Sequence, residues 1–321
     1  MSSIAILGEA LIDLRVVTGT EPTKKNHPAA RSYTAQPGGS PFNVAIGLGR
    51  LGHRAAFAGR LANDALGGIL RRHAQQSGVS LELAGEWPGP SPAALFDLNE
   101  DGSARYEFHL GNAREALFAP TVVDDDVEAV HFGSLASWMP GSADAVLESV
   151  ARLRGGGTFV SYDPNIRGML IPDKDEARDR VEQAVALSDL VKASVEDLAW
   201  LYPDLSPSQA AQRWLTPGSK RAVVVTHGAA GADCHSANAI LHGGSSPVTV
   251  IDTVGAGDAF MAGLLDGLAA AAALSADGLA EVLKKPVEVR SLLDGACAHA
   301  AATCARPGAD PPWRQRTTTA A

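Results

Sequence analysis

The chain has 321 residues, of which 45% are hydrophobic and 20% are charged, and its formal net charge at pH 7 is -9. This composition is ordinary for a globular protein with a substantial core, and the lack of a basic stripe argues against a nucleic-acid partner. Glu9 and Asp13 interrupt the N-terminal apolar run, and the most apolar long stretch, 259–274, is too short to cross a bilayer. We therefore expect neither a signal peptide nor a membrane partner. Three cysteines without metal-ligand spacing indicate reduced thiols and a cytoplasmic protein.

Short β-rich runs alternate with helical patterns along the chain. This alternation predicts an α/β fold, with a mostly parallel sheet covered by helices on both faces. Pro41 near a helix start, Asn63 as a helix cap and Gly78 as a helix stop support the boundaries. The expected strands are 4–7, 55–58, 129–132, 158–162, 190–191 and 222–226, and the expected helices are 43–51, 65–76, 143–152, 177–187, 209–215, 259–273 and 287–305.

Two stretches, about 15–36 and 88–110, do not follow the alternation. The second contains two strand-like runs, 94–98 and 104–108, joined by a segment with Asp-Gly, which is a hairpin signal. We interpret both stretches as a small β-sheet lid on a single domain; two unrelated surface excursions are the alternative. Exposed lid strands could pair between two copies, so a homodimer through the lid is a further hypothesis.

The segment 252–260 is the most informative part of the sequence. A strand-like run, 248–251, precedes it, and an Ala-rich helical pattern follows it. The first N–H groups of a helix have no partner within the helix and form an anion site together with the helix dipole. Gly255 and Gly257 let the backbone approach a phosphate closely. Asp258 is then either a plain helix cap or a carboxylate that takes a proton from an attacking hydroxyl.

We consider three classes of protein that could carry such a glycine-containing loop at a helix start. A phosphotransferase needs mainly alignment and charge neutralisation, which this loop offers, although the chain has no Gly-x4-Gly-Lys-Ser/Thr loop and no protein-kinase signature. A non-catalytic sugar or nucleotide sensor on the same scaffold is an alternative. A dinucleotide-binding oxidoreductase is disfavoured, because Gly8-Glu9-Ala10 lacks the Gly-x-Gly-x-x-Gly pattern.

The segments 252–260, 38–45 and 59–67 resemble the two signatures of the ribokinase-like (PfkB) family of carbohydrate kinases. The resemblance extends over nearly the whole chain. It implies a three-layer α/β/α ribokinase-like fold with a β lid, and ATP-dependent phosphorylation of a sugar with Mg²⁺. It also implies Asp258 as the general base, an anion hole from Gly255, Ala256 and Gly257, and sugar contacts from Asp13, Gly38, Gly39 and Asn43.

The resemblance assigns further residues to the nucleotide and to metal ions. Lys192, Ser194 and Asp197 stand where the family has a segment tied to magnesium and phosphate, so Asp197 is a candidate for Mg²⁺, directly or through water. An ordinary pair of acids at a helix start is the alternative. The carboxylate of Asp252 and the carbonyl of Val254 resemble a monovalent-cation loop that could hold K⁺. The residues implied to surround the nucleotide are Thr226, Gly228, Gly231 and Cys297.

The identity of the sugar depends on fewer residues. The segment 163–167 resembles fructokinase-like and 2-keto-3-deoxygluconate kinase-like members, and Arg167 could offer a planar fork to an oxygen of the substrate. Tyr106 and Phe108 could stack on the sugar or form the core of the lid. We expect fructose or a similar neutral ketose, followed by a 2-keto-3-deoxy sugar acid and then by ribose or a nucleoside.

Overall fold

The computed structural model describes residues 2–16, 32–98, 104–111, 123, 127–244 and 247–314. Its centre is an eight-stranded sheet whose strand order is β14-β13-β12-β11-β10-β9-β1-β4. The bounds of these strands are β1 Ser3–Leu7, β4 Arg54–Ala58, β9 Ala129–Gly133, β10 Phe159–Asp163, β11 Leu190–Ser194, β12 Ala222–Thr226, β13 Ala232–His235 and β14 Ile240–Gly243.

The six strands predicted from the sequence are all present, and they pair in parallel. The two that were not predicted, β13 and β14, pair antiparallel at one edge. They are only four residues each and follow β12 without a crossover helix, so the strand–helix alternation does not signal them. The predicted strand at 248–251 is wrong: the segment forms no strand, and Val250 and Ile251 are exposed.

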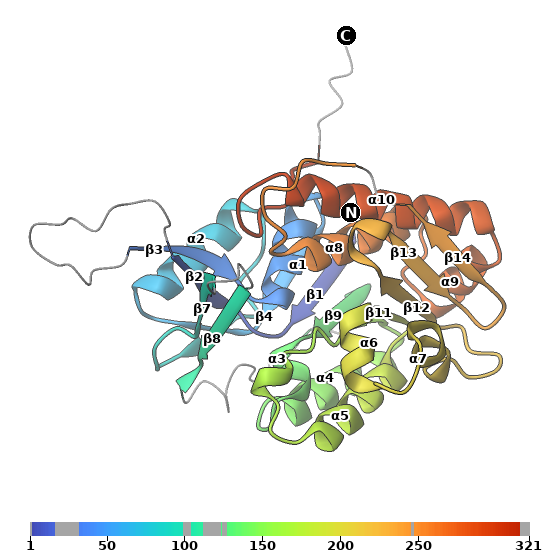
Figure 1. The fold of residues 1–321 in the computed structure, drawn as a ribbon, viewed down its shortest axis with the longest axis horizontal. Helices are drawn as coiled ribbons and strands as arrows, with labels where there is room; N and C mark the ends of the chain where they lie inside the picture. The colour runs from blue at the N-terminus through green and yellow to red at the C-terminus, as the bar shows by residue number, and fades with distance from the viewer. Residues whose placement is uncertain are drawn as a thin grey trace, which may run out of the picture.

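Alternate residues of the buried strands point to opposite faces of the sheet, as the pleat requires. Ile4 and Ile6 of β1 pack into one core cluster with α1, α2, α8, α9 and α10. Ala5 and Leu7 pack into a second cluster with α3, α4, α5, α6 and α7. Each fully buried Leu or Ile contributes roughly 1.5–3 kcal/mol, and the two clusters give the three-layer α/β/α arrangement seen in Figure 1.

The helices agree with the sequence to within a few residues, with three omissions. The unpredicted helices are short: α3, α6 and α9. Asp64, rather than the predicted Asn63, caps α2, because its Oδ1 accepts a hydrogen bond of 2.7 Å from the Gly67 amide. None of the described helices combines the length and hydrophobicity needed to span a bilayer. The bounds are α1 Ser40–Arg50, α2 Ala65–Gln76, α3 Leu135–Trp138, α4 Ala143–Gly155, α5 Lys174–Leu187, α6 Val195–Leu201, α7 Pro207–Arg213, α8 Ala256–Ala270, α9 Ala276–Leu283 and α10 Pro286–Cys304.

A separate four-stranded sheet, here called the small sheet, lies beside the central sheet, at the left in Figure 1. Its order is β3-β2-β7-β8, and β7 and β8 form the antiparallel pair predicted from the sequence. The turn between them, 99–103, lies outside the described residues, as does the charged segment 17–31. The small sheet starts at Leu11 rather than near residue 15, so Asp13 belongs to it. Its bounds are β2 Leu11–Val16, β3 Tyr33–Gly38, β7 Ala93–Leu98 and β8 Ala104–His109, and a separate short pair consists of β5 Arg60–Ala62 and β6 Gly85–Trp87.

Candidate active site

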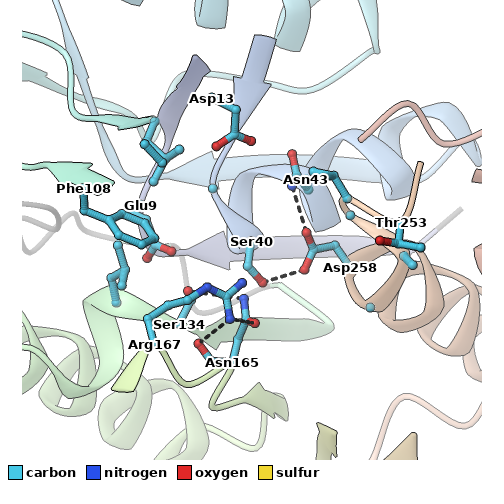
Figure 2. Close-up of a pocket in the computed structure, with 18 of the residues that line it drawn as sticks. Glu9, Asp13, Ser40, Asn43, Phe108, Ser134, Asn165, Arg167, Thr253 and Asp258 are labelled. Atoms are coloured by element: carbon cyan, nitrogen blue, oxygen red, sulfur yellow. Dashed lines mark hydrogen bonds between the residues drawn. The ribbon is translucent and has the colours of Figure 1, made fainter. Parts of the chain in front are cut away.

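The carboxyl ends of the parallel strands meet at one edge of the central sheet, and polar side chains gather there. Glu9 follows β1, Ser134 follows β9, and Asn165 and Arg167 follow β10. Such an edge is where open α/β sheets bind ligands. With the small sheet and the start of α8, these residues enclose a first cavity of about 230 Å³ (Figure 2).

The start of α8 supplies backbone N–H groups to this cavity. Gly255 is the residue before the helix and has φ 75°, a left-handed conformation that a residue with a side chain adopts only with strain. A Cβ on Gly255 would also lie 2.5 Å from Cβ of Ala309. Ala256 and Gly257 open the helix, where N–H groups lack acceptors within the helix; the Ala256 amide donates to the Thr253 carbonyl at 3.2 Å. The turn therefore has the geometry of an anion site, as its sequence predicts.

Asp258 stands in the first turn of α8, lines the cavity and is held in a fixed orientation. Its Oδ1 accepts a hydrogen bond of 2.7 Å from Ser40 Oγ, and its Oδ2 accepts one of 2.8 Å from Asn43 Nδ2 (Figure 2). Both donors come from the start of α1. A carboxylate has about four acceptor positions, so these two bonds orient Asp258 and leave it able to accept a proton. Asn43, expected to contact the substrate, is thus bound to the candidate base.

Two more carboxyl groups, Glu9 and Asp13, face the same cavity. Burial raises the pKa of Glu9 to about 7, although Ser134 and the Ala136 amide hydrogen-bond to it. Burial, and then the nearby charge of Asp258, raise the pKa of Asp13 to about 7. A cavity with this set of acceptors suits a ligand rich in hydroxyl donors.

Gly38 makes room for the carboxyl group of Asp13, and Gly39 makes room for the backbone of Glu9. A Cβ on Gly38 would lie 2.3 Å from Oδ2 of Asp13, and a Cβ on Gly39 would lie 2.7 Å from the carbonyl oxygen of Glu9. Gly39 also has φ 99° and precedes α1. Gly39 lines the first cavity, whereas Gly38 supports Asp13 from behind.

A buried ion pair lies under the anion site. Lys192 Nζ is 2.6 Å from Asp163 Oδ2, and the two side chains are 5% and 1% exposed. Burial alone would lower the pKa of Lys192, but Asp163 keeps it above its ordinary value; burial raises the pKa of Asp163 to about 6. A Cβ on Gly257 would lie 3.0 Å from Lys192 Nζ. The ammonium group therefore faces the anion site from the first cavity, not from the nucleotide side where the sequence had placed it.

A second cavity, of about 560 Å³, lies on the other side of the α8 turn. Thr253, Ala256 and Gly257 line both cavities, so the anion site forms the boundary between them. Four of the six residues expected at the nucleotide line the second cavity, whereas Lys192 and Ser194 do not: the four are Thr226, Gly228, Gly231 and Cys297. Most of the residues that line it are small and apolar. Such a lining fits a purine, with the phosphates directed at the helix start.

The segment that ends β11 and begins α6 has the structural role that the sequence analysis gave as the alternative, that of an acid at a helix start. Ser194 caps α6, and Oδ2 of Asp197 accepts hydrogen bonds from Ser194 N and Oγ, at 2.9 and 2.8 Å. Oδ1 of Asp197 accepts a bond of 2.7 Å from the Ile166 amide. Both residues lie outside the linings of the two cavities. A direct metal contact from Asp197 and a nucleotide contact from Ser194 are therefore not supported by the geometry.

The other candidate carboxylate for a metal ion is also engaged by protein groups. Asp252 is paired with Arg15 and accepts bonds from the Gly308 and Val254 amides. Within the described part of the chain, no group of three or more His, Cys, Asp or Glu could hold a metal ion. Mg²⁺ bound here would have to be held mainly by phosphate oxygens and water, which is a common arrangement for this ion.

Of the aromatic and basic residues expected to contact the sugar, the structure describes the side chains of two. Phe108 and Arg167 line the first cavity. Arg167 Nη1 donates to Asn165 Oδ1 at 2.7 Å and to the Ile166 carbonyl at 3.1 Å, which fixes the guanidinium at the cavity wall. Tyr106 belongs to β8, but its side chain lies outside the described residues.

Sequence reasoning missed Glu9, Ser40, Asp163 and Arg15 as parts of the site. Three of them lie inside segments that had been singled out: Glu9 beside Asp13, Ser40 beside Gly39, and Asp163 beside Arg167. A signal was therefore present, but only the fold shows which neighbour in each segment points inward. Arg15 carried no signal in the sequence.

The comparisons with known proteins agree with this geometry. A model described as pfkB family carbohydrate kinase matches residues 1–316. A fructokinase of Rhizobium leguminosarum bv. trifolii is 38% identical over 268 residues, covering 83% of this chain and 79% of the relative.

Two solved structures are similar over nearly their full length. A fructokinase of Xylella fastidiosa with bound ATP has a TM-score of 0.82 and 26% identity, covering 95% of this chain and 93% of that one. A double mutant of a Vibrio cholerae O395 fructokinase with fructose, ADP and potassium ion bound has a TM-score of 0.73 and 27% identity, covering 96% and 94%. The chain therefore belongs to the pfkB family of carbohydrate kinases and transfers a phosphoryl group from ATP to a sugar hydroxyl.

Proposed function

We propose that the sugar is fructose or a closely similar neutral ketose, bound in the first cavity with one hydroxyl beside Asp258. One observation carries the proposal: the two cavities share Thr253, Ala256 and Gly257, so an acceptor in the first meets the end of a nucleotide in the second. Asp258 lies on the acceptor side of that boundary.

The proposed step is a single displacement at phosphorus. ATP supplies the terminal phosphoryl group. The sugar oxygen forms its bond to phosphorus as the bond from phosphorus to the bridging oxygen of ADP breaks, and the hydroxyl proton passes to Asp258. The amides of the α8 turn donate hydrogen bonds to the phosphoryl oxygens, and Lys192 offsets part of their charge.

ATP and a metal ion are the cofactors of the reaction, and we propose Mg²⁺ as the ion. Mg²⁺ keeps several waters and binds through substrate phosphates, which suits a site where Asp197 is already occupied by protein donors. The cytoplasm is the proposed compartment, in keeping with the three free thiols.

A homodimer through the small sheet also remains a proposal. Among the described strands, β3 and β8 stand at the edges of that sheet, where unpaired backbone groups could bond to a second copy. Light scattering of the purified protein should give the mass of two chains, and a single-chain mass across the concentration range would contradict the pairing.

Two features bear on the choice of sugar. Glu9 and Asp13 offer oxygens to neutral hydroxyls, and because their pKa values are raised to about 7, the ionised fraction of each opposes a negatively charged sugar only in part near neutral pH. Arg167 at the same wall favours the second candidate, a 2-keto-3-deoxy sugar acid, because a guanidinium can hold a carboxylate with two parallel hydrogen bonds. The similar fructokinases support the neutral ketose.

An assay of ADP release tests the proposal. Purified protein with MgATP is offered fructose, tagatose, ribose, 2-keto-3-deoxygluconate and adenosine in turn, and kcat/KM should be highest for fructose. Preference for the sugar acid would replace fructose by the second candidate. Sugar binding without ADP release from any compound would contradict the proposed reaction.

The Asp258→Asn variant tests the base. It should lower kcat by about 10²–10⁴-fold while KM for ATP and the melting temperature change little. The matched control is Asp277→Asn, since Asp277 is an exposed first-turn acid of α9 whose side chain is 86% exposed. Equal kcat in both variants would remove Asp258 from the base role.

A further inference from the structure

Asp252 is almost fully buried beside the loop that leads to the anion site. Its side chain is 3% exposed, and both carboxylate oxygens have protein partners. Oδ1 accepts a hydrogen bond of 3.1 Å from the Val254 amide, and Oδ2 accepts one of 2.9 Å from the Gly308 amide. Oδ2 also forms an ion pair with the guanidinium of Arg15. Burial disfavours a charged carboxylate, but these bonds hold the pKa of Asp252 below its usual value.

Asp252 lies at a point of the fold that attracts positive charge. The amides of Ile251 and Asp252 both donate to the carbonyl of Cys304, the last residue of α10. A helix C-terminus carries partial negative charge. The carboxylate adds a full negative charge at the same end, so a cation is expected to bind there.

Arg15 reaches this point from the small sheet. It lies on β2, two residues after Asp13, and its side chain is 35% exposed. A second contact joins the same elements: the amide of Gln36 on β3 packs on Gly308, where an added Cβ would lie 2.9 Å from Gln36 Oε1. The base of the small sheet is thus attached both to Asp252 and to the 308 loop.

The resemblance to the family, and the potassium ion in the Vibrio cholerae relative, raise the question whether Asp252 and Val254 hold K⁺. The arrangement in this chain does not fit that role. A K⁺ ion on Asp252 would share one buried carboxylate with the guanidinium of Arg15, and two unit positive charges a few Å apart on that carboxylate repel each other. No step of the reaction is therefore assigned to K⁺.

We propose that Arg15 supplies, as part of the protein, the positive charge that a monovalent cation would otherwise supply at Asp252, so that this kinase is independent of K⁺. Arg15 is then a positioning residue. It holds Asp252, and through Val254 the turn that carries the anion site, while remaining attached to the sheet that also carries Asp13.

The test compares wild type, Arg15→Met and Arg15→Lys in KCl and in choline chloride at equal ionic strength. The kinetic arm rests on the proposed function and measures kcat and KM for fructose. Wild type should give the same kcat in both salts. Arg15→Met should lose activity in choline chloride by a factor on the order of ten, the size of a coupling between neighbouring sites, and should regain it as K⁺ is added. Arg15→Lys should behave like wild type.

A second arm needs no turnover and separates failure of this inference from failure of the proposed function. The melting temperature of wild type should not depend on which of the two salts is present, whereas that of Arg15→Met should rise in KCl relative to choline chloride. The matched control is Arg178→Met, because Arg178 forms an ion pair with Asp175 on the exposed side of α5; the melting temperature of this variant should respond to neither salt.

A wild type that melts higher or turns over faster in KCl would overturn the inference, and so would an Arg15→Met variant that is fully active in choline chloride. If Arg15→Met does not fold, wild type alone still decides. A melting temperature or kcat of wild type that depends on K⁺ contradicts the inference, and a melting temperature and kcat that are both independent of K⁺ support it.

Discussion

Replacing Lys192 with methionine keeps most of the length of the side chain and removes its ammonium group. The variant separates two effects of the buried pair, one on stability and one on the phosphoryl group. In the wild type, Nζ lies 2.6 Å from Asp163 Oδ2, with both side chains at most 5% exposed.

The effect on stability follows from what remains after the replacement. Breaking a buried pair by removing one partner costs about 3–5 kcal/mol, because the other charge is left uncompensated. Asp163 can avoid part of that cost by taking up a proton, since its pKa is already raised to about 6. The pKa of Asp163 in the folded state is already above that in the unfolded state, and it rises further when Lys192 is removed. The variant is therefore least impaired in acid and loses stability, relative to wild type, as the pH rises through neutrality.

The effect on catalysis follows from the place of Nζ beside Gly257. Removal of one donor aimed at developing oxygen charge lowers kcat by about 10²–10³-fold. A charge that acts only on the transferring group should leave KM for the sugar nearly unchanged.

Urea unfolding at several pH values and single-turnover ADP release measure the two effects separately. Lys220→Met is the matched control, since Lys220 pairs with Asp277 on the surface, with its side chain 57% exposed, and solvent screens such an exposed pair. A Lys192→Met variant with wild-type kcat would refute the placement of the ammonium group at the phosphoryl. A stability loss that does not depend on pH would refute the protonation of Asp163.

Three further predictions concern the first cavity. Glu9→Gln should remove a fall in stability of roughly 3 kcal/mol that wild type shows as the pH rises from about 4.5 to 7, because the pKa of Glu9 is raised in the folded state; melting temperatures across that range should have a smaller slope, and an unchanged slope would count against the raised pKa. Gly39→Ala should cost on the order of 1–3 kcal/mol from its positive φ and should raise KM for the sugar by displacing the Glu9 backbone; an unfolding midpoint and KM equal to those of wild type would contradict the steric argument. Ser40→Ala removes a hydrogen bond to Asp258, a kind of bond worth about 1.5–3 kcal/mol, and should lower kcat by about ten- to a hundredfold with little change in KM for ATP; unchanged steady-state kcat would show that Asn43 alone orients the base.

The central sheet could be predicted because its strands are buried on both faces and read as apolar runs such as 222–226. The edge strand β14 and its neighbour β13 could not, since each has only four residues and both follow β12 without a crossover helix. The strand predicted at 248–251 is absent although its β-branched residues favour a strand. Within the described structure no neighbouring strand pairs with this segment, and Val248 and Val250 line the second cavity. Propensity describes the side chains but not whether a partner strand is present.

Within the site, the backbone features were more predictable than the side-chain network. The types and spacing of Gly255, Gly257 and Asp258 predict the turn that forms the anion site. The partners of Asp258 come from α1, more than 200 residues away, and the partner of Lys192 comes from β10. Such pairings depend on strand order and helix packing, which a local pattern does not contain. Asp197 shows the converse, because an acid at a helix start looks the same in sequence whether it caps the helix or binds a metal.

Among the described residues, Thr253, Ala256 and Gly257 line both cavities and form the boundary between them. A single compound made of adenosine, a short phosphate chain and a ketose could therefore occupy both cavities at once. Its two halves would bind as one molecule, and the second half would gain an effective concentration in the millimolar range without any new contact. The boundary across which the phosphoryl group passes between the two substrates thus also allows the enzyme to be inhibited by a compound that links an analogue of ATP to an analogue of the sugar.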